Sequence, residues 1–98
     1  MMDELFATAL HALTVDVEGG PVIVDLRDGT SVALNDVAAA IWRGVVRGEP
    51  AADVSRELAS RFAIDEQRAS ADVAAFLSTL AARGLVHDRV GPRGDERR

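Results

Sequence analysis

Few side chains in this sequence could carry out catalysis or hold a metal ion. The two histidines, His11 and His87, lie far apart, and neither belongs to a His-Glu-x-x-His pattern. There is no cysteine, so the sequence offers no thiolate metal site and no disulfide framework. The glycines before Pro21 are not followed by a helix, as a phosphate-binding loop requires, and no Ser, His and Asp set has a nucleophile context. We expect no catalysis, no cofactor and no bound metal.

The recognition chemistry that the sequence does offer lies in the backbone of residues 30–34. Asp28-Gly29 is expected to form the tight turn of a hairpin, because such dipeptides allow positive φ. Small and apolar residues then alternate, as in a strand with one buried face. This stretch contains no Lys or Pro, with which proteins usually protect an exposed strand edge. We therefore expect its outer edge to pair with an extended peptide from another protein.

Two further strands are needed to position this edge. Alternating residues predict a strand over residues 11–18, and β-branched residues predict another over residues 22–26. Short turns join the three strands, which predicts an antiparallel meander with the third strand at one edge. The face of the first strand that we expect to be buried carries His11, Leu13, Val15 and Val17. A three-stranded sheet is marginal alone, so the following helices should cover it.

Three helices are predicted after the strands. Asn35 is expected to cap the first helix, from about Asp36 to Arg47, which Gly48 ends. Pro50 fits the first turn of the second helix, and a third runs from the cap Asp65 to Gly84. The inward side chains at helical spacing are expected to be Val37, Ile41, Val45, Val54, Leu58, Phe62, Val73, Phe76, Leu77 and Leu80, with Trp42 structural. The fold class is α+β, in the order β-β-β-α-α-α.

The composition describes one domain of 98 residues, with 48% hydrophobic and 28% charged residues. Every basic residue is Arg, and the net charge of −5 disfavours nucleic acid as a partner. No apolar run approaches the roughly 20 residues that a membrane span needs, and the N-terminus lacks the basic residues of a signal peptide. We expect a cytoplasmic monomer or weak dimer that does not bind membranes. Residues 1–9 should be frayed or a short helical stripe, residues 10–88 the domain, and residues 89–98 a disordered tail.

The sequence over residues 25–62 resembles the PqqD-like family. That family combines a strand, a Gly turn and a second strand with Leu-Asn, small residues and Ile-Trp before a second Gly-containing turn. The matching residues here are Leu34-Asn35, Ala38-Ala39-Ala40, Ile41-Trp42 and Gly48, and later Asp72-Val73, Phe76-Leu77 and Gly84-Leu85-Val86. The resemblance extends over about residues 10–87. Two departures are the absence of any Tyr and an N-terminal segment without a counterpart.

The resemblance implies a winged-helix-like recognition element for ribosomally synthesised, post-translationally modified peptides. Such a protein is a non-catalytic adaptor that binds the leader of a precursor peptide and presents it to a separate leader peptidase or modifying enzyme. The chain is similar to the stand-alone leader-binding proteins of lasso-peptide biosynthesis, and also to the peptide chaperone of quinone-cofactor biosynthesis.

The family also implies that the third helix forms the second wall of the peptide groove. Val73 and Phe76 are expected to line it, so that Val73→Glu or Phe76→Ala weakens peptide binding while the fold stays intact. Alternatively, most of these apolar side chains are core residues. The full predicted peptide-binding set is Thr30, Ser31, Val32, Ala33 and Leu34 of the strand, with Arg68, Ala69, Asp72, Val73, Phe76, Leu77 and Leu80 of the helix.

Two other classes of function remain for a chain with this pattern. A helix-turn-helix DNA-binding protein would use the third helix for recognition, but the early positions of that helix hold Glu66 and Asp72 after Asp65, against Arg68 alone. A structural module would pair its open edge with its own copy. A gel shift with duplex DNA and light scattering with and without peptide distinguish these classes.

Overall fold

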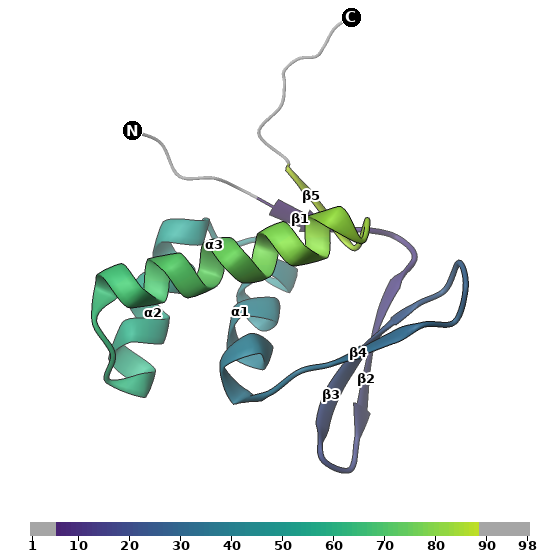
Figure 1. Cartoon of the computed structure of the whole chain (residues 1–98), viewed down its shortest axis with the longest axis horizontal. Coiled ribbons are helices and arrows are strands. Elements are labelled where there is room, and N and C mark those ends of the chain that lie inside the picture. The colour runs from purple at the N-terminus through teal and green to yellow at the C-terminus, as the bar shows by residue number, and fades with distance from the viewer. Residues whose placement is uncertain (1–5, 89–98) are drawn as a thin grey trace, which may run out of the picture.

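The chain runs from a short strand through a three-stranded sheet into three helices and returns in a last short strand (Figure 1). The computed structural model describes residues 6–88. Its elements are β1 (Phe6–Thr8), β2 (Ala12–Val17), β3 (Gly20–Asp25), β4 (Ser31–Ala33), α1 (Asp36–Val46), α2 (Ala51–Phe62), α3 (Glu66–Ala82) and β5 (Val86–Asp88). The predicted α+β class is confirmed, with three antiparallel strands followed by three helices.

The larger sheet has the order β2-β3-β4, so β3 is central and β4 lies at an edge. Both neighbouring pairs are antiparallel, which confirms the predicted meander. The connection before β4 is longer than the predicted two-residue turn: Leu26, Arg27 and Asp28 are its turn residues, and the amide of Gly29 donates to the carbonyl of Asp25 at 2.7 Å. The carboxylate of Asp28 accepts from the amide and the hydroxyl of Thr30, and Gly29 has a φ of +79°. That left-handed backbone conformation favours glycine, as the Asp-Gly pair predicted.

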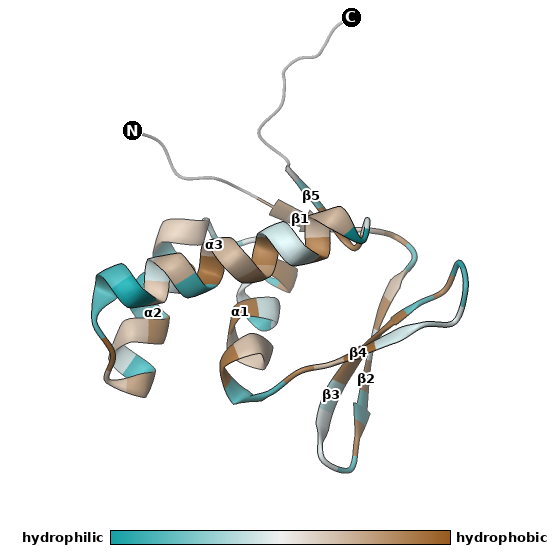
Figure 2. Cartoon of the chain, viewed as in Figure 1, coloured by the Kyte–Doolittle hydropathy of each residue, from teal (hydrophilic) through white to brown (hydrophobic). Residues whose placement is uncertain are grey.

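The helices begin and end close to the predicted residues. The side chain of Asn35 accepts a 2.8 Å hydrogen bond from the amide of Ala38, which confirms the predicted N-cap of α1. Pro50 and Asp65 occupy the N-cap positions of α2 and α3, and neither makes a side-chain capping bond. Figure 2 shows hydrophilic residues gathered in the first turn of α3 and in the hairpin turns.

The core lies where the three helices meet the inner face of the sheet. Trp42 is 2% exposed, and its indole donates a 2.6 Å hydrogen bond to the hydroxyl of Thr14. This confirms the structural role predicted for the single Trp. Trp42 belongs to one core cluster together with buried hydrophobic residues from every helix, from β3, from β5 and from the connecting segments: Ile23, Leu34, Ala39, Ile41, Val45, Val54, Leu58, Ala59, Ala69, Val73, Leu77, Leu80, Leu85 and Val86.

No residue of β2 is fully buried, and the side of the strand that faces the core is the opposite of the predicted one. Leu13 and Val17 are 48% and 49% exposed, whereas Thr14 on the other face bonds Trp42. In the register of the sheet Thr14 lies opposite Ile23, which is fully buried, so this pair belongs to the inner face. The alternation located the strand correctly, but hydrophobicity alone did not identify the side that faces the core, where Thr14 bonds Trp42.

The segment before β2 forms a strand where we expected a helical stripe or a frayed end. Phe6–Thr8 pairs antiparallel with Val86–Asp88, and Ala9 donates a 2.9 Å hydrogen bond to the carbonyl of Leu85. A second, two-stranded sheet therefore joins the two ends of the described chain. The predicted disordered tail, residues 89–98, lies outside the described residues.

Candidate functional site

The hydrogen bonds between β3 and β4 determine which backbone groups of β4 remain at its free edge. The amide of Asp25 donates to the carbonyl of Thr30 at 2.8 Å. The amide of Leu34 donates to the carbonyl of Pro21 at 3.0 Å. In an antiparallel ladder the residues that face the partner strand alternate, so residues 30, 32 and 34 direct their backbone groups toward β3.

Ser31 and Ala33 therefore direct their amide and carbonyl groups away from β3. Among residues 6–88 no other strand pairs with this edge, because β4 is the last strand in the order β2-β3-β4. Both residues are exposed. Two donors and two acceptors consequently stand in a row at the surface, which is the pattern that an added antiparallel strand requires.

The side chains of β4 divide between the two faces of the sheet. Val32 lies opposite Ile23 and shares its inner face, where it is partly buried against the core. Ser31 and Ala33 lie on the outer face. Leu34 is 5% exposed and Thr30 is exposed at the hairpin turn, so the predicted strand set contains one core residue.

The predicted residues of α3 also divide into two groups. The core group is Ala69, Val73, Leu77 and Leu80, each 3% exposed or less. The accessible group is Arg68, Asp72 and Phe76, of which Phe76 is partly buried against the core. Helical spacing could not separate the groups, since both lie on one broad stripe. Val73 is a core residue, so Val73→Glu would place a charge in the interior and should destabilise the fold, which makes it unsuitable as a test of peptide binding.

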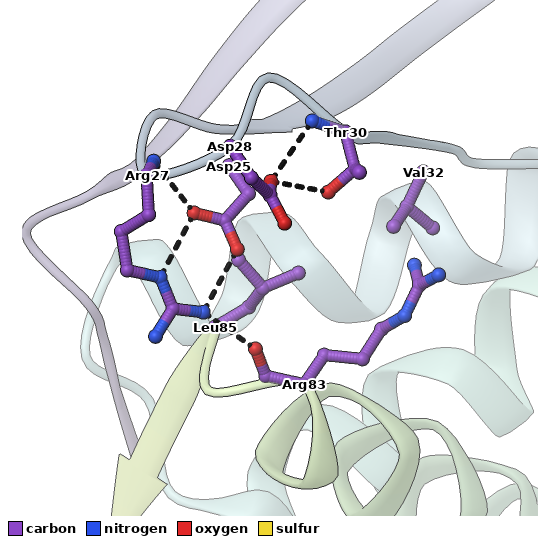
Figure 3. Close-up of a pocket in the computed structure, with 7 residues that line it drawn as sticks. All are labelled: Asp25, Arg27, Asp28, Thr30, Val32, Arg83 and Leu85. Carbon is purple, nitrogen blue, oxygen red and sulfur yellow. Dashed lines mark hydrogen bonds and ion pairs between the residues drawn. The ribbon is translucent and has the colours of Figure 1, made fainter.

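A cavity of about 260 Å³ opens where the β3–β4 turn approaches the end of α3 (Figure 3). Of the predicted residues, only Thr30 and Val32 line it. The other lining residues are Asp25, Arg27, Asp28, Arg83 and Leu85. These five residues were missed because they come from two segments more than 50 residues apart in the sequence, 25–28 and 83–85. The signal in the sequence that could have pointed to them is the segment Asp25-Leu26-Arg27-Asp28, in which three of four residues are charged.

An ion pair holds the cavity wall together. Arg27 donates to both carboxylate oxygens of Asp25, from Nε at 3.0 Å and from Nη2 at 2.8 Å, and its amide adds a third bond. These hydrogen bonds lower the pKa of Asp25 from 3.8 to about 2, and that of Arg27 is raised in return. Nη2 of Arg27 also donates to the carbonyl of Arg83 at 2.8 Å, which ties the turn to the C-terminus of α3.

The junction after α3 is held from a second side. Nε2 of His11 lies 2.8 Å from the carbonyl oxygen of Gly84. Gly84 has a φ of +75°, and a Cβ at this position would lie 3.0 Å from the guanidinium of Arg27. The backbone conformation therefore favours glycine at this position, and a larger residue would have to displace the end of the Arg27 side chain.

The described residues offer little for other kinds of site. No group of three His, Asp or Glu side chains within residues 6–88 is arranged to hold a metal ion. In the same part of the chain no helix has the length and apolar character to cross a membrane. The exposed first turns of α3 carry Glu66 and Asp72, the latter only 3.9 Å from Arg68, so this face is a poor match for phosphate.

Comparison with known proteins gives two similar solved structures. One is described as lasso peptide synthetase B1 complexed with the leader peptide. It has a TM-score of 0.79 and 29% identity, over 84% of this chain and 96% of that one. The other, described as TbiB1 in complex with the TbiA(beta) leader peptide, has a TM-score of 0.77 and 19% identity, over 91% of this chain and 99% of that one.

No protein with a curated function matches the chain in sequence. Residues 20–86 match the family described as coenzyme PQQ synthesis protein D, PqqD. The match begins at β3 and ends at the start of β5, so it includes the β4 edge, all three helices and every residue that lines the cavity. The chain therefore belongs to the PqqD family.

Proposed function

We propose that this protein is a non-catalytic adaptor that binds the leader segment of a precursor peptide and presents it to a separate leader peptidase or modifying enzyme. The observation that carries the proposal is the open edge of β4, where Ser31 and Ala33 offer two donors and two acceptors to an incoming strand. The solved structures described as leader-peptide complexes support it.

The energetics indicate which contacts decide affinity. Four backbone hydrogen bonds contribute about 0.5–1.5 kcal/mol each, whereas each buried apolar anchor contributes about 1.5–3 kcal/mol. Together they must exceed an association cost of about 4–15 kcal/mol. The backbone bonds therefore set the register of the leader, and most of the affinity comes from apolar anchors. Val32 and Phe76 are the partly buried apolar side chains that β4 and α3 offer for that purpose.

The product class is proposed from the comparisons and needs a separate observation. A small precursor gene beside genes for a leader peptidase and a cyclase supports lasso-peptide biosynthesis. Neighbouring genes for quinone-cofactor synthesis support the chaperone alternative. In either case the precursor gene found nearby gives the leader sequence that is used as the probe in the binding experiment.

The direct experiment measures binding of the fluorescein-labelled leader by fluorescence anisotropy and compares two proline variants. Ala33→Pro removes an amide that points away from β3, so it should weaken binding by at least tenfold while the fold stays intact. Asp16→Pro is the matched control, because Asp16 lies opposite Pro21 and its amide points outward at the other edge of the sheet. It should bind the leader like the wild type.

The comparison has two results that contradict the proposal. If the wild-type protein does not bind the leader at micromolar concentration, the adaptor function is wrong. If Ala33→Pro and Asp16→Pro bind equally well, the leader does not pair with β4. Circular dichroism of each variant confirms that the binding data refer to folded protein.

A further inference from the structure

We propose that the cavity between the β3–β4 turn and the end of α3 is a subsite for an acidic side chain of the bound leader, with Arg83 as its cationic partner. The inference rests on the proposed leader binding and specifies the chemistry that one part of the site would recognise. It follows from the position of Arg83, from the engagement of the other charged groups, and from the register at β4.

Arg83 is held in place through its backbone, which leaves its side chain available. It is the C-terminal cap of α3, and its carbonyl accepts from Arg27 at 2.8 Å. Figure 3 shows its side chain extending along the cavity toward Val32, away from the pair formed by Asp25 and Arg27. Among residues 6–88 no carboxylate forms an ion pair with Arg83.

The other charges of the cavity are already engaged. Asp25 accepts three hydrogen bonds from Arg27, and Asp28 accepts two from Thr30, which lower the pKa of both carboxyl groups. Both acids are therefore ionised at neutral pH, and these hydrogen bonds lie within the turn. Arg27 neutralises the charge of Asp25, and its Nη2 also donates to the carbonyl of Arg83, whereas Asp28 is bonded to the neutral groups of Thr30. The guanidinium of Arg83 is therefore the cationic group of the cavity that can donate hydrogen bonds to a ligand. A carboxylate is the group that accepts such bonds most strongly.

The register of an added strand brings a side chain to this cation. The backbone groups of Val32 face β3, so on the free side Val32 occupies a non-hydrogen-bonded position. The leader residue opposite such a position lies close, at a Cα separation of about 4.5 Å, with its side chain on the same face of the sheet. That face is the one on which Val32 lines the cavity. The side chain of the leader residue opposite Val32 would therefore lie at the cavity, which Arg83 also lines.

The test is a double-mutant cycle between Arg83→Gln and substitutions in the leader. Each Asp and Glu of the leader is replaced in turn by Asn or Gln, and binding is measured by fluorescence anisotropy. Arg83→Gln should weaken binding of the native leader about threefold to tenfold, and one leader position should lose its effect when Arg83 is absent. This coupling should shrink at 1 M salt, where charges in partial contact with water are screened.

Two controls separate the subsite from net charge and from the proposed function. Arg43→Gln removes the same charge from the exposed side of α1 and should leave binding unchanged. Arg83→Lys should restore part of the affinity, since it keeps the charge and loses the planar donors. Binding that depends on the β4 edge but shows no coupling between Arg83 and any leader acid overturns the subsite and leaves the adaptor function standing. No binding of the native leader overturns both.

Discussion

The indole of Trp42 and the hydroxyl of Thr14 form a 2.6 Å hydrogen bond that joins α1 to the inner face of β2. Trp42 is 2% exposed, whereas Thr14 is exposed, so the bond lies at the boundary between the core and solvent. Thr14→Val keeps the shape of the side chain and removes the acceptor. We expect a loss of about 0.5–1.5 kcal/mol in the free energy of unfolding, measured by urea denaturation.

The control for that prediction is Thr14→Ser, which retains the hydroxyl. It should recover most of the lost stability. Equal stabilities for the Val and Ser variants would show that the bond contributes nothing beyond packing.

The ion pair of Asp25 and Arg27 predicts how stability changes with acid. The pKa of Asp25 falls from 3.8 to about 2 on folding, so the folded protein favours the ionised carboxylate. A lowered folded pKa contributes stability that is complete above pH 3.8 and disappears as the pH falls toward 2. Urea denaturation of wild type and Asp25→Asn should therefore show a wild-type advantage at pH 6 that narrows below pH 4. Parallel stability curves across this range would contradict the assignment.

Local chemistry predicted the elements well. The positive φ of Gly29 and the Asn35 cap each depend on neighbouring residues, and both appear where the sequence places them, although the loop around Gly29 is longer than a two-residue turn. The same holds for the end of α3 at Gly84.

Long-range pairing limited the prediction of the rest. β1 pairs with β5, and the bond between Arg27 and Arg83 links residues 56 positions apart. No local pattern encodes either contact. The orientation of β2 is likewise set by non-local contacts, because Thr14 bonds Trp42 of α1, 28 positions away.

The close approach of α1 and α2 depends on Gly44. A Cβ at this position would lie 2.7 Å from Cγ2 of Val54, well inside normal contact. Alanine improves helix propensity by about 1 kcal/mol, but overpacking costs about 1–3 kcal/mol. Gly44→Ala should therefore leave stability unchanged or lower it by up to about 2 kcal/mol.

The informative measurement is the cycle with Val54→Ala, using urea denaturation of all four proteins. Removing the Val54 methyl groups provides space for the new Cβ, so the double variant should be more stable than the two single changes add up to. If the two substitutions change the free energy of unfolding additively, the new Cβ does not clash with Val54, and α1 and α2 must move apart at little cost.

Phe76 and Leu77 are neighbours on α3 that should differ in what they control. Leu77 is 3% exposed, and Leu77→Ala should lower the free energy of unfolding by about 2–5 kcal/mol. Phe76 is only partly buried and reaches the surface on the side of Arg68 and Asp72. If it is an anchor for the leader, Phe76→Ala should weaken binding about fivefold to thirtyfold, because it removes about 1–2 kcal/mol of apolar contact.

Leader binding and stability must be distinguished, so binding by the two variants is compared under conditions in which both are equally folded. Leader binding is therefore measured by anisotropy at a temperature where both variants are folded by circular dichroism. Leu77→Ala should then bind nearly as tightly as the wild type, since its side chain faces the core and not the leader. The reverse ranking, with binding sensitive to Leu77 and indifferent to Phe76, would move the groove away from this surface of α3. In that case the apolar anchor would have to be sought beside Val32, the partly buried apolar side chain of β4.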